Sequence, residues 1–450
     1  MALMDEPAQN ENHGQRRLRR AGLTGVVTLL ARGVTVGIGL VTLPLTSHYL
    51  GKERFGLWLT LSSFITWMAI ADFGLANSLI NALSTADGKD DRRAAQQAVA
   101  SAFWLVLAVA VAVILICLAL APLVSWERVF NVSSPAAVAE AAPAMLVVLV
   151  ICALRLPASL VGCVYQAYQE GYLHQLWSGL SGVLGAAGLL LAIKLEAGLP
   201  WLVLAFLGSM LLADLLSAAY LFGWRRSWLL PHPQRFNSAE ARWLLRQGGQ
   251  FWVAQMSAVL MLQVGLFLVA RMFGAGSAAE YGTTLRLCTL IGAVQTAFVA
   301  PLWAAYGEAA ARQDFVWLTG TFRQSLRVSL WWAVPMALLL LLGLPWAFKL
   351  LVTADVTSSW HLRLALLTAE IVNAAARCVS TLLNGLGAVR SQAIFGPLGG
   401  ATNLLLSWLL GRWLGVPGIA WATVICLVIF WLGVMGRDAA LRLREMHYAR

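Results

Sequence analysis

The chain is a succession of long apolar runs separated by short polar connections that are rich in glycine, proline or arginine. A helix that crosses the hydrocarbon core of a bilayer needs about 20 consecutive, mostly apolar residues. The pattern therefore predicts an all-α polytopic membrane protein with about twelve transmembrane helices. The predicted spans are 22–48, 56–82, 98–124, 142–167, 175–194, 199–223, 246–270, 280–306, 325–351, 361–386, 391–412 and 416–436.

Composition supports this interpretation. Of the 450 residues, 60% are hydrophobic and 12% are charged, whereas soluble domains have about 45–50% apolar and about 25% charged residues. These values exclude a disordered chain, a secreted disulfide scaffold and an ordinary cytosolic enzyme. The 6 cysteines all lie inside apolar runs and none forms a CxxC pair, which indicates buried thiols rather than disulfides or a zinc site.

The net charge of +11 reflects membrane topology rather than nucleic-acid binding. Of the 32 lysines and arginines, twenty fall on one side of the predicted spans, eight on the other and four inside them. The positive-inside rule then places both termini in the cytoplasm of a cell with a cytoplasmic (inner) membrane. We expect a basic cytoplasmic N-terminus over 1–21, with no cleavable signal peptide, and a basic amphipathic tail over 437–450 on the cytoplasmic surface.

The longest polar connection, 224–245, divides the spans into two groups of six, an N-lobe over 22–223 and a C-lobe over 246–436. Shifting the sequence by about 225 residues places Gly51 on Gly276 and Asp91 near Asp314, which favours an internal repeat. Because each half has an even number of spans, both halves have the same orientation in the membrane. They would then be related by an axis along the membrane normal, with a substrate path between them.

Several polar residues lie inside the predicted spans, where a charge costs about 2.5–3.5 kcal/mol and usually faces a bundle interior or a water-filled cavity. Two interpretations are open: ion pairs between helices, or side chains that line a cavity. Glu370 and Arg377 are two turns apart, about 10 Å along the axis, so we expect them to be too far apart to pair directly. The candidate cavity residues are Arg32, Asp72, Asn77, Arg155, Arg286, Glu370, Asn373, Arg377 and Asn384.

The intramembrane charges do not balance. The predicted spans contain four arginines (Arg32, Arg155, Arg286 and Arg377) but only three acids, which are Asp72, Asp214 and Glu370. Pairing cannot neutralise all four, and a surplus of buried positive charge beside a cavity is suited to an anion. The planar fork of arginine donors favours phosphate in particular.

Four short stretches carry recognisable motifs: Leu50–Trp58, Asp72–Leu75, Trp126 with Phe130, Asn131 and Val132, and Pro301–Ala309 with Arg312 and Asp314. These stretches resemble the polysaccharide-biosynthesis flippases of the multidrug/oligosaccharidyl-lipid/polysaccharide (MOP) exporter superfamily. Many of those relatives carry an acidic cluster in the seventh helix, where this chain has Val264, Gly265 and Leu266.

The resemblance implies two six-helix lobes around a central cavity, as in the MATE-like fold. It also implies export of a polyprenyl-diphosphate-linked oligosaccharide by alternating access, for synthesis of O-antigen, capsule or exopolysaccharide. Related lipid II flippases place cavity arginines on the first and eighth helices, which implies a diphosphate-binding role for Arg32 and Arg286. The implied partners are the lipid-linked glycan, membrane lipids and polysaccharide polymerase machinery, with no nucleic acid. No cofactor is implied, and coupling to a proton or sodium gradient is left open.

Two other functions compete with the flippase hypothesis. A MATE-like, ion-coupled exporter of small organic molecules would share the fold, but cavities for cationic drugs favour acids over the arginine excess seen here. An integral-membrane enzyme would need a sizeable aqueous loop or a paired-carboxylate site. The outer connections are short and the sequence contains no HExxH or DxD pattern, so we expect a transporter rather than an enzyme.

Overall fold

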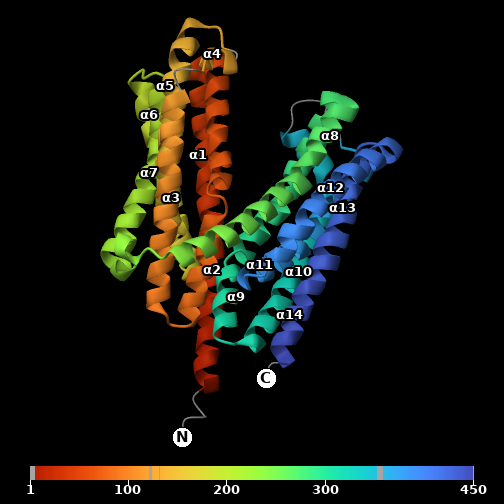
Figure 1. Cartoon of the computed structure of the whole chain (residues 1–450). Helices are drawn as coiled ribbons and strands as arrows, with labels where there is room; N and C mark the ends of the chain where they lie inside the picture. The colour runs from red at the N-terminus through yellow and green to blue at the C-terminus, as the bar shows by residue number, and fades with distance from the viewer. Residues whose placement is uncertain (1–5, 121–123, 131, 352–357, 449–450) are drawn as a thin grey trace. The chain divides into compact units, whose positions relative to one another are not determined.

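The computed structural model describes residues 6–120, 124–130, 132–351 and 358–448, and within these ranges all regular secondary structure is helical (Figure 1). Eleven described helices are long and apolar enough to cross a membrane. The all-α polytopic architecture predicted from the apolar runs is confirmed. The motif residue Asn131 lies outside the described residues.

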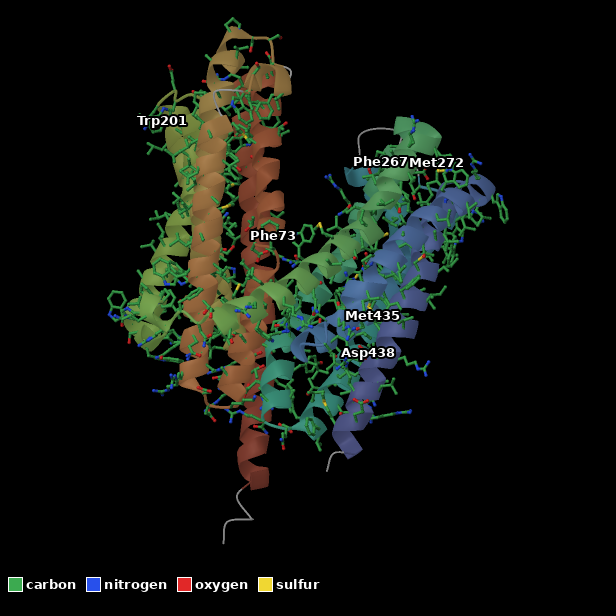
Figure 2. The ribbon with its side chains drawn as sticks, viewed as in Figure 1. Phe73, Trp201, Phe267, Met272, Met435 and Asp438 are labelled. Carbon is green, nitrogen blue, oxygen red and sulfur yellow. The ribbon has the colours of Figure 1, made fainter. Side chains whose placement is uncertain are left out.

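The expected span 56–82 is not one continuous helix. Helix α1 (Glu6–Ala71) ends just before Asp72, and α2 (Leu75–Gly88) starts after Gly74. Phe73, labelled in Figure 2, and Gly74 have φ angles of 51° and 74°, which no α-helix accommodates. An uninterrupted span across this segment was therefore a wrong prediction, because the hydropathy of the run does not register a turn made by three residues.

Helix α1 also begins earlier than the first predicted span. It starts at Glu6 rather than near residue 22, and it is kinked at Gly51, where φ is 68° and ψ is 176°. This combination lies in a region that only glycine occupies readily. The part of this extension around Arg17 is buried against other helices of the protein.

The chain divides into two compact units, one of residues 23–248 and one of residues 1–22 with 249–450. The first unit contains most of α1, with α2, α3 (Arg92–Leu120), α4 (Trp126–Val129), α5 (Pro135–Ala167), α6 (Gly171–Lys194) and α7 (Leu199–Tyr220). Short turns at Leu221–Arg225, Ser227–Leu229 and Pro233–Arg235 follow α7. One apolar core in this unit gathers Leu61, Trp58, Val148, Leu202 and Leu207.

The second unit contains the start of α1 and most of α8 (Ser238–Val299), which begins within the polar connection between the two groups of spans. It continues with α9 (Leu302–Ala311), α10 (Phe315–Leu351), α11 (Trp360–Gly385), α12 (Arg390–Leu414), α13 (Val416–Cys426), the π-helical segment η5 (Leu427–Met435) and α14 (Gly436–Tyr448). Two apolar cores hold it together, one around Tyr306 and Leu382 and one around Val269 and Leu366.

The two units repeat the same backbone features. Gly274 kinks α8 with a φ of 85° and a ψ of 176°, close to the values at Gly51 in α1. Asp91 accepts a hydrogen bond from the amide of Ala94 at 2.9 Å and so caps α3. Asp314 caps α10 in the same way through Trp317, at 3.3 Å. The internal repeat thus extends to helix kinks and caps, with Gly274 rather than Gly276 as the counterpart of Gly51.

Candidate functional site

Glu370 and Arg377 form a direct ion pair on α11. The Arg377 Nη2 atom lies 2.8 Å from Glu370 Oε2, and the Glu370 residue is only 6% exposed. The expectation that two turns would separate these groups too far was wrong. Residues seven apart share a helix face, and long side chains on a helix lean toward its N-terminus, so the arginine reaches back along the axis to the acid.

Gln295 completes this polar cluster, and sequence reasoning did not identify it. Its Oε1 accepts a hydrogen bond from Arg377 Nε at 2.9 Å, and its Nε2 donates to the carbonyl of Ala374 at 2.7 Å. Gln295 lies on α8 and is 4% exposed. A buried glutamine among apolar neighbours was the available signal, because such a side chain needs partners inside the protein.

Arg155 and Asp214 pair between two helices of the first unit. Arg155 Nε on α5 donates to Asp214 Oδ2 on α7 at 2.9 Å, and both side chains are mostly buried. This pair corresponds to the interhelical ion-pair interpretation rather than to an open cavity charge. Two of the three acids inside the spans, Glu370 and Asp214, are therefore paired with arginines.

In the described part of the chain, the Asp72 carboxylate binds backbone amides and not another charged side chain. Its carboxylate accepts hydrogen bonds from the amides of Gly74 and Ala76, both at 3.0 Å, and so caps the start of α2. Asn77 lies in the first turn of this helix and is half-buried. On α11, Asn373 is 8% exposed, and Asn384 accepts a hydrogen bond from Gln392 at 2.8 Å.

Arg32 and Arg286 are both exposed on their helices, α1 and α8. They belong to different units of the chain. Within the part of the chain that the structure describes, the Arg286 guanidinium forms no ion pair, although the Arg286 carbonyl accepts a bond from Thr289 at 2.8 Å. Since Asp72, Asp214 and Glu370 are engaged elsewhere, none of the three acids inside the spans is shown paired with Arg286.

Arg17 is the charged residue whose position sequence reasoning missed. We counted it among the arginines of the cytoplasmic face, yet it is 2% exposed and packs within the second unit. Its guanidinium donates to both oxygens of Glu308 at 3.3 Å and to Asp314 at 2.8 Å, and it lies 4.8 Å from the centre of the Trp317 ring. Arg312 binds the same Glu308 at 3.0 Å.

This cluster gives a physical reason for the stretch Pro301–Asp314, which carries part of the sequence resemblance. Glu308, Arg312 and Asp314 surround a buried arginine from the first turns of the chain. A buried charge is stable only when it is paired and hydrogen-bonded. The acidic residues of the motif therefore hold the start of α1 against α9 and α10.

The comparison with protein families decides the classification. The family model described as "Polysaccharide biosynthesis protein" matches residues 24–306, which is more than half of the chain. The chain belongs to this family. A search of curated proteins finds no match.

Solved structures show which fold the polysaccharide biosynthesis protein adopts. A MOP superfamily transporter from Pyrococcus furiosus matches with a TM-score of 0.80 and 14% identity, over 96% of this chain and 97% of the other. A point mutant of the Vibrio cholerae MATE transporter VcmN matches with a TM-score of 0.79 and 16% identity, over 98% of this chain and 99% of the other. An outward-facing MATE family multidrug resistance transporter matches with a TM-score of 0.79 and 15% identity, over 96% of both chains.

These matches establish a MATE/MOP-like fold over nearly the full length. The polysaccharide biosynthesis protein is thus a multi-pass membrane protein with the fold of MOP superfamily transporters. The prediction of a polysaccharide-biosynthesis family from four short stretches is confirmed.

Proposed function

We propose that this polysaccharide biosynthesis protein is a flippase for a polyprenyl-diphosphate-linked oligosaccharide. It would move the lipid-linked glycan from the cytoplasmic to the outer leaflet by alternating access. In this proposal both termini are cytoplasmic, because twenty of the lysines and arginines fall on that side of the spans and eight on the other. The repeat unit would then serve synthesis of a surface polysaccharide.

The observation that carries the proposal is the way the intramembrane charges are paired. Arg155 binds Asp214, and Arg377 binds Glu370, at 2.9 and 2.8 Å. Asp72 is used to cap a helix. The acids are therefore engaged within the protein, and the exposed guanidinium of Arg286 keeps a positive charge that an anionic ligand can neutralise.

Diphosphate is the anion that fits both this charge and the family. Arginine stays protonated at every physiological pH and presents donors in a fork that matches phosphate oxygens. We propose that Arg286, and Arg32 on the other unit, each contact the diphosphate during transport. Asp72, Asn77, Asn373 and Asn384 would line the path of the sugar, while Arg155, Glu370 and Arg377 support the helices that form it.

The similar Pyrococcus furiosus transporter is described as having a binding pocket of reversed polarity that suggests a different function. A positively charged site in this chain would likewise differ from a site for cationic drugs. This favours the glycan flippase over the MATE-like exporter of small organic molecules.

The test is export of lipid-linked glycan in a deletion strain that carries Arg286→Ala, Arg32→Ala or Arg286→Lys. We expect each alanine variant to lose export while the amount of membrane-inserted protein stays at the wild-type level. Arg286→Lys should retain part of the activity, because the charge persists without the fork. Arg271→Ala, at an exposed arginine near the Gly274 kink, is the matched control and should export normally.

Two results would overturn the proposal. Full complementation by both alanine variants would remove the diphosphate-binding role. Clear ethidium extrusion by the wild-type protein, together with unchanged surface glycan in the deletion strain, would favour the small-molecule exporter instead.

A further inference from the structure

A groove of about 760 Å³ lies in the second unit between α10 and α14, which run side by side in Figure 1. Its wall is largely apolar and includes Phe315, Phe322 and Leu443. Figure 2 labels Met435, the last residue of η5, and Asp438 in the first turn of α14; Gly436, between them in sequence, lines the groove. Ligand pockets in proteins measure about 300–1,000 Å³, so the groove is large enough for part of an amphipathic molecule.

Two arginines stand at this apolar wall. Arg323 on α10 and Arg444 on α14 both line the groove and are both exposed. Among the described residues, neither guanidinium has a carboxylate within ion-pair distance. Of the two acids on α14, Asp438 is 3.0 Å from Arg442 and so is already paired, and Glu445 forms no ion pair with either groove arginine in the part of the chain that the structure describes. The groove therefore combines an apolar surface with two positive charges that the described protein does not neutralise.

The groove lies within helices that are candidate membrane spans, Phe315–Leu344 and Val416–Met446. Phe315 directly follows a connection that we place in the cytoplasm, and α14 runs to the cytoplasmic C-terminus. Arginine side chains near the ends of spans extend toward the head-group layer while their stems cover apolar surface. With this orientation in a membrane, the walls would contact acyl chains and the guanidinium groups would reach the level of lipid phosphates.

We propose that this groove binds an anionic phospholipid of the cytoplasmic leaflet, with one acyl chain along Phe315, Phe322 and Leu443 and the phosphate between Arg323 and Arg444. The location in this leaflet rests on the orientation given under the proposed function. A zwitterionic lipid carries its own cation, so it would gain less from two arginines. A glycan would need many hydrogen-bond partners, but the only hydroxyl on the wall is that of Thr319.

Binding is measured on the purified, delipidated full chain in a neutral detergent, by native mass spectrometry with added dioleoylphosphatidylglycerol or dioleoylphosphatidylcholine. We expect the wild type to prefer phosphatidylglycerol. Since each basic side chain near an anionic lipid strengthens binding about fivefold, Arg323→Gln/Arg444→Gln should bind it about 30-fold more weakly. The matched control Arg246→Gln/Arg390→Gln removes two exposed arginines outside the groove and should bind like the wild type.

A second pair of variants tests the apolar wall without changing charge. Ala440→Trp fills the groove and should abolish the preference for phosphatidylglycerol. Leu441→Trp, on a neighbouring exposed position that does not line the groove, should leave it intact.

Three results would overturn the proposal. Equal binding of the two lipids by the wild type would show that the arginines do not select an anion. Unchanged phosphatidylglycerol binding by the double glutamine variant would place the lipid elsewhere. Displacement by inorganic pyrophosphate or by a polyprenyl diphosphate at equal concentration would indicate a free-anion or substrate site. None of these measurements involves transport. A result that overturns the lipid-binding groove would therefore not contradict the proposal of a flippase.

Discussion

The Arg17 guanidinium is 2% exposed and lies 3.3 Å from the Glu308 carboxylate, 291 positions away in the sequence. Asp314 binds the same guanidinium at 2.8 Å. Both acids and the arginine belong to one compact unit, although Arg17 stands in the first turns of a helix that continues into the other unit. This contact therefore fixes where the N-terminal segment packs.

We predict that Arg17→Ala destabilises the protein strongly. Removing one partner of a buried ion pair leaves an uncompensated charge and costs about 3–5 kcal/mol. The free energy of unfolding, measured in detergent, should fall by roughly that amount, and Arg16→Ala at the exposed neighbouring position should change it by less than about 0.5 kcal/mol. An Arg17→Ala protein as stable as the wild type would show that Arg312 alone compensates Glu308.

Positions such as Arg17 mark the limit of sequence reasoning about this fold. Runs of about 20 apolar residues suffice to predict membrane helices, and four motifs suffice to predict the family. Arginine at the end of an apolar run, however, satisfies the positive-inside pattern whether it is exposed or buried. Only the long-range contact with Glu308 distinguishes the two cases, and hydropathy contains no information about it.

The candidate site shows the same limit in another form. Counting charges correctly identified more arginines than acids inside the spans, but it could not assign partners. Axial spacing argued against a pair between Glu370 and Arg377, because it ignored the length and direction of the arginine side chain. Asp72 was predicted to line a cavity because it lies inside a predicted span, and hydropathy did not reveal that its carboxylate also caps α2 through the amides of Gly74 and Ala76.

We predict that Arg155 and Asp214 stabilise the first unit as a pair. Arg155→Met alone, or Asp214→Leu alone, should lower the free energy of unfolding by about 2 kcal/mol, as expected for a lost hydrogen bond to a charged group. The double variant should be closer to the wild type than either single variant, since an apolar pair of similar size replaces a buried ion pair at little cost. Thermal unfolding of the four proteins gives the coupling energy.

This experiment also separates a structural role from substrate binding. Glycan export by the double variant should remain measurable if the pair only supports α5 and α7. Loss of export in a double variant of normal stability would instead place Arg155 or Asp214 on the substrate path.

We predict opposite effects of Gly→Ala at two positions of α1. Gly51 has a φ of 68° and a ψ of 176°, and no atom lies within 4 Å of an added Cβ. The cost of Gly51→Ala is therefore conformational, about 1–3 kcal/mol. A Cβ added at Gly37 would also meet no atom within 4 Å, but Gly37 lies in a regular helical turn. Gly37→Ala should therefore raise the free energy of unfolding by about 0.5–1 kcal/mol.

Melting temperatures of the two alanine variants in the same detergent provide the measurement. Gly274→Ala, at the corresponding kink of α8, should behave like Gly51→Ala, because its φ of 85° and ψ of 176° require glycine as well. Stabilisation by both kink substitutions would show that the kinks straighten without cost.

We predict that the contact between Glu53 and the start of α5 weakens in acid. The hydrogen bonds that Glu53 accepts from Ser134 and Ser133 lower its pKa from 4.5 to about 2. A carboxyl whose pKa is lower in the folded state than in the unfolded state stabilises the fold fully above about pH 4.5, and this contribution disappears as the pH falls through about 2. Glu53→Gln should therefore be less stable than the wild type at pH 6, and the difference should shrink steadily by pH 3. Parallel melts of Glu196→Gln, an exposed acid beyond α6, control for general effects of charge, and a stability difference for Glu53→Gln that does not change with pH would contradict the prediction.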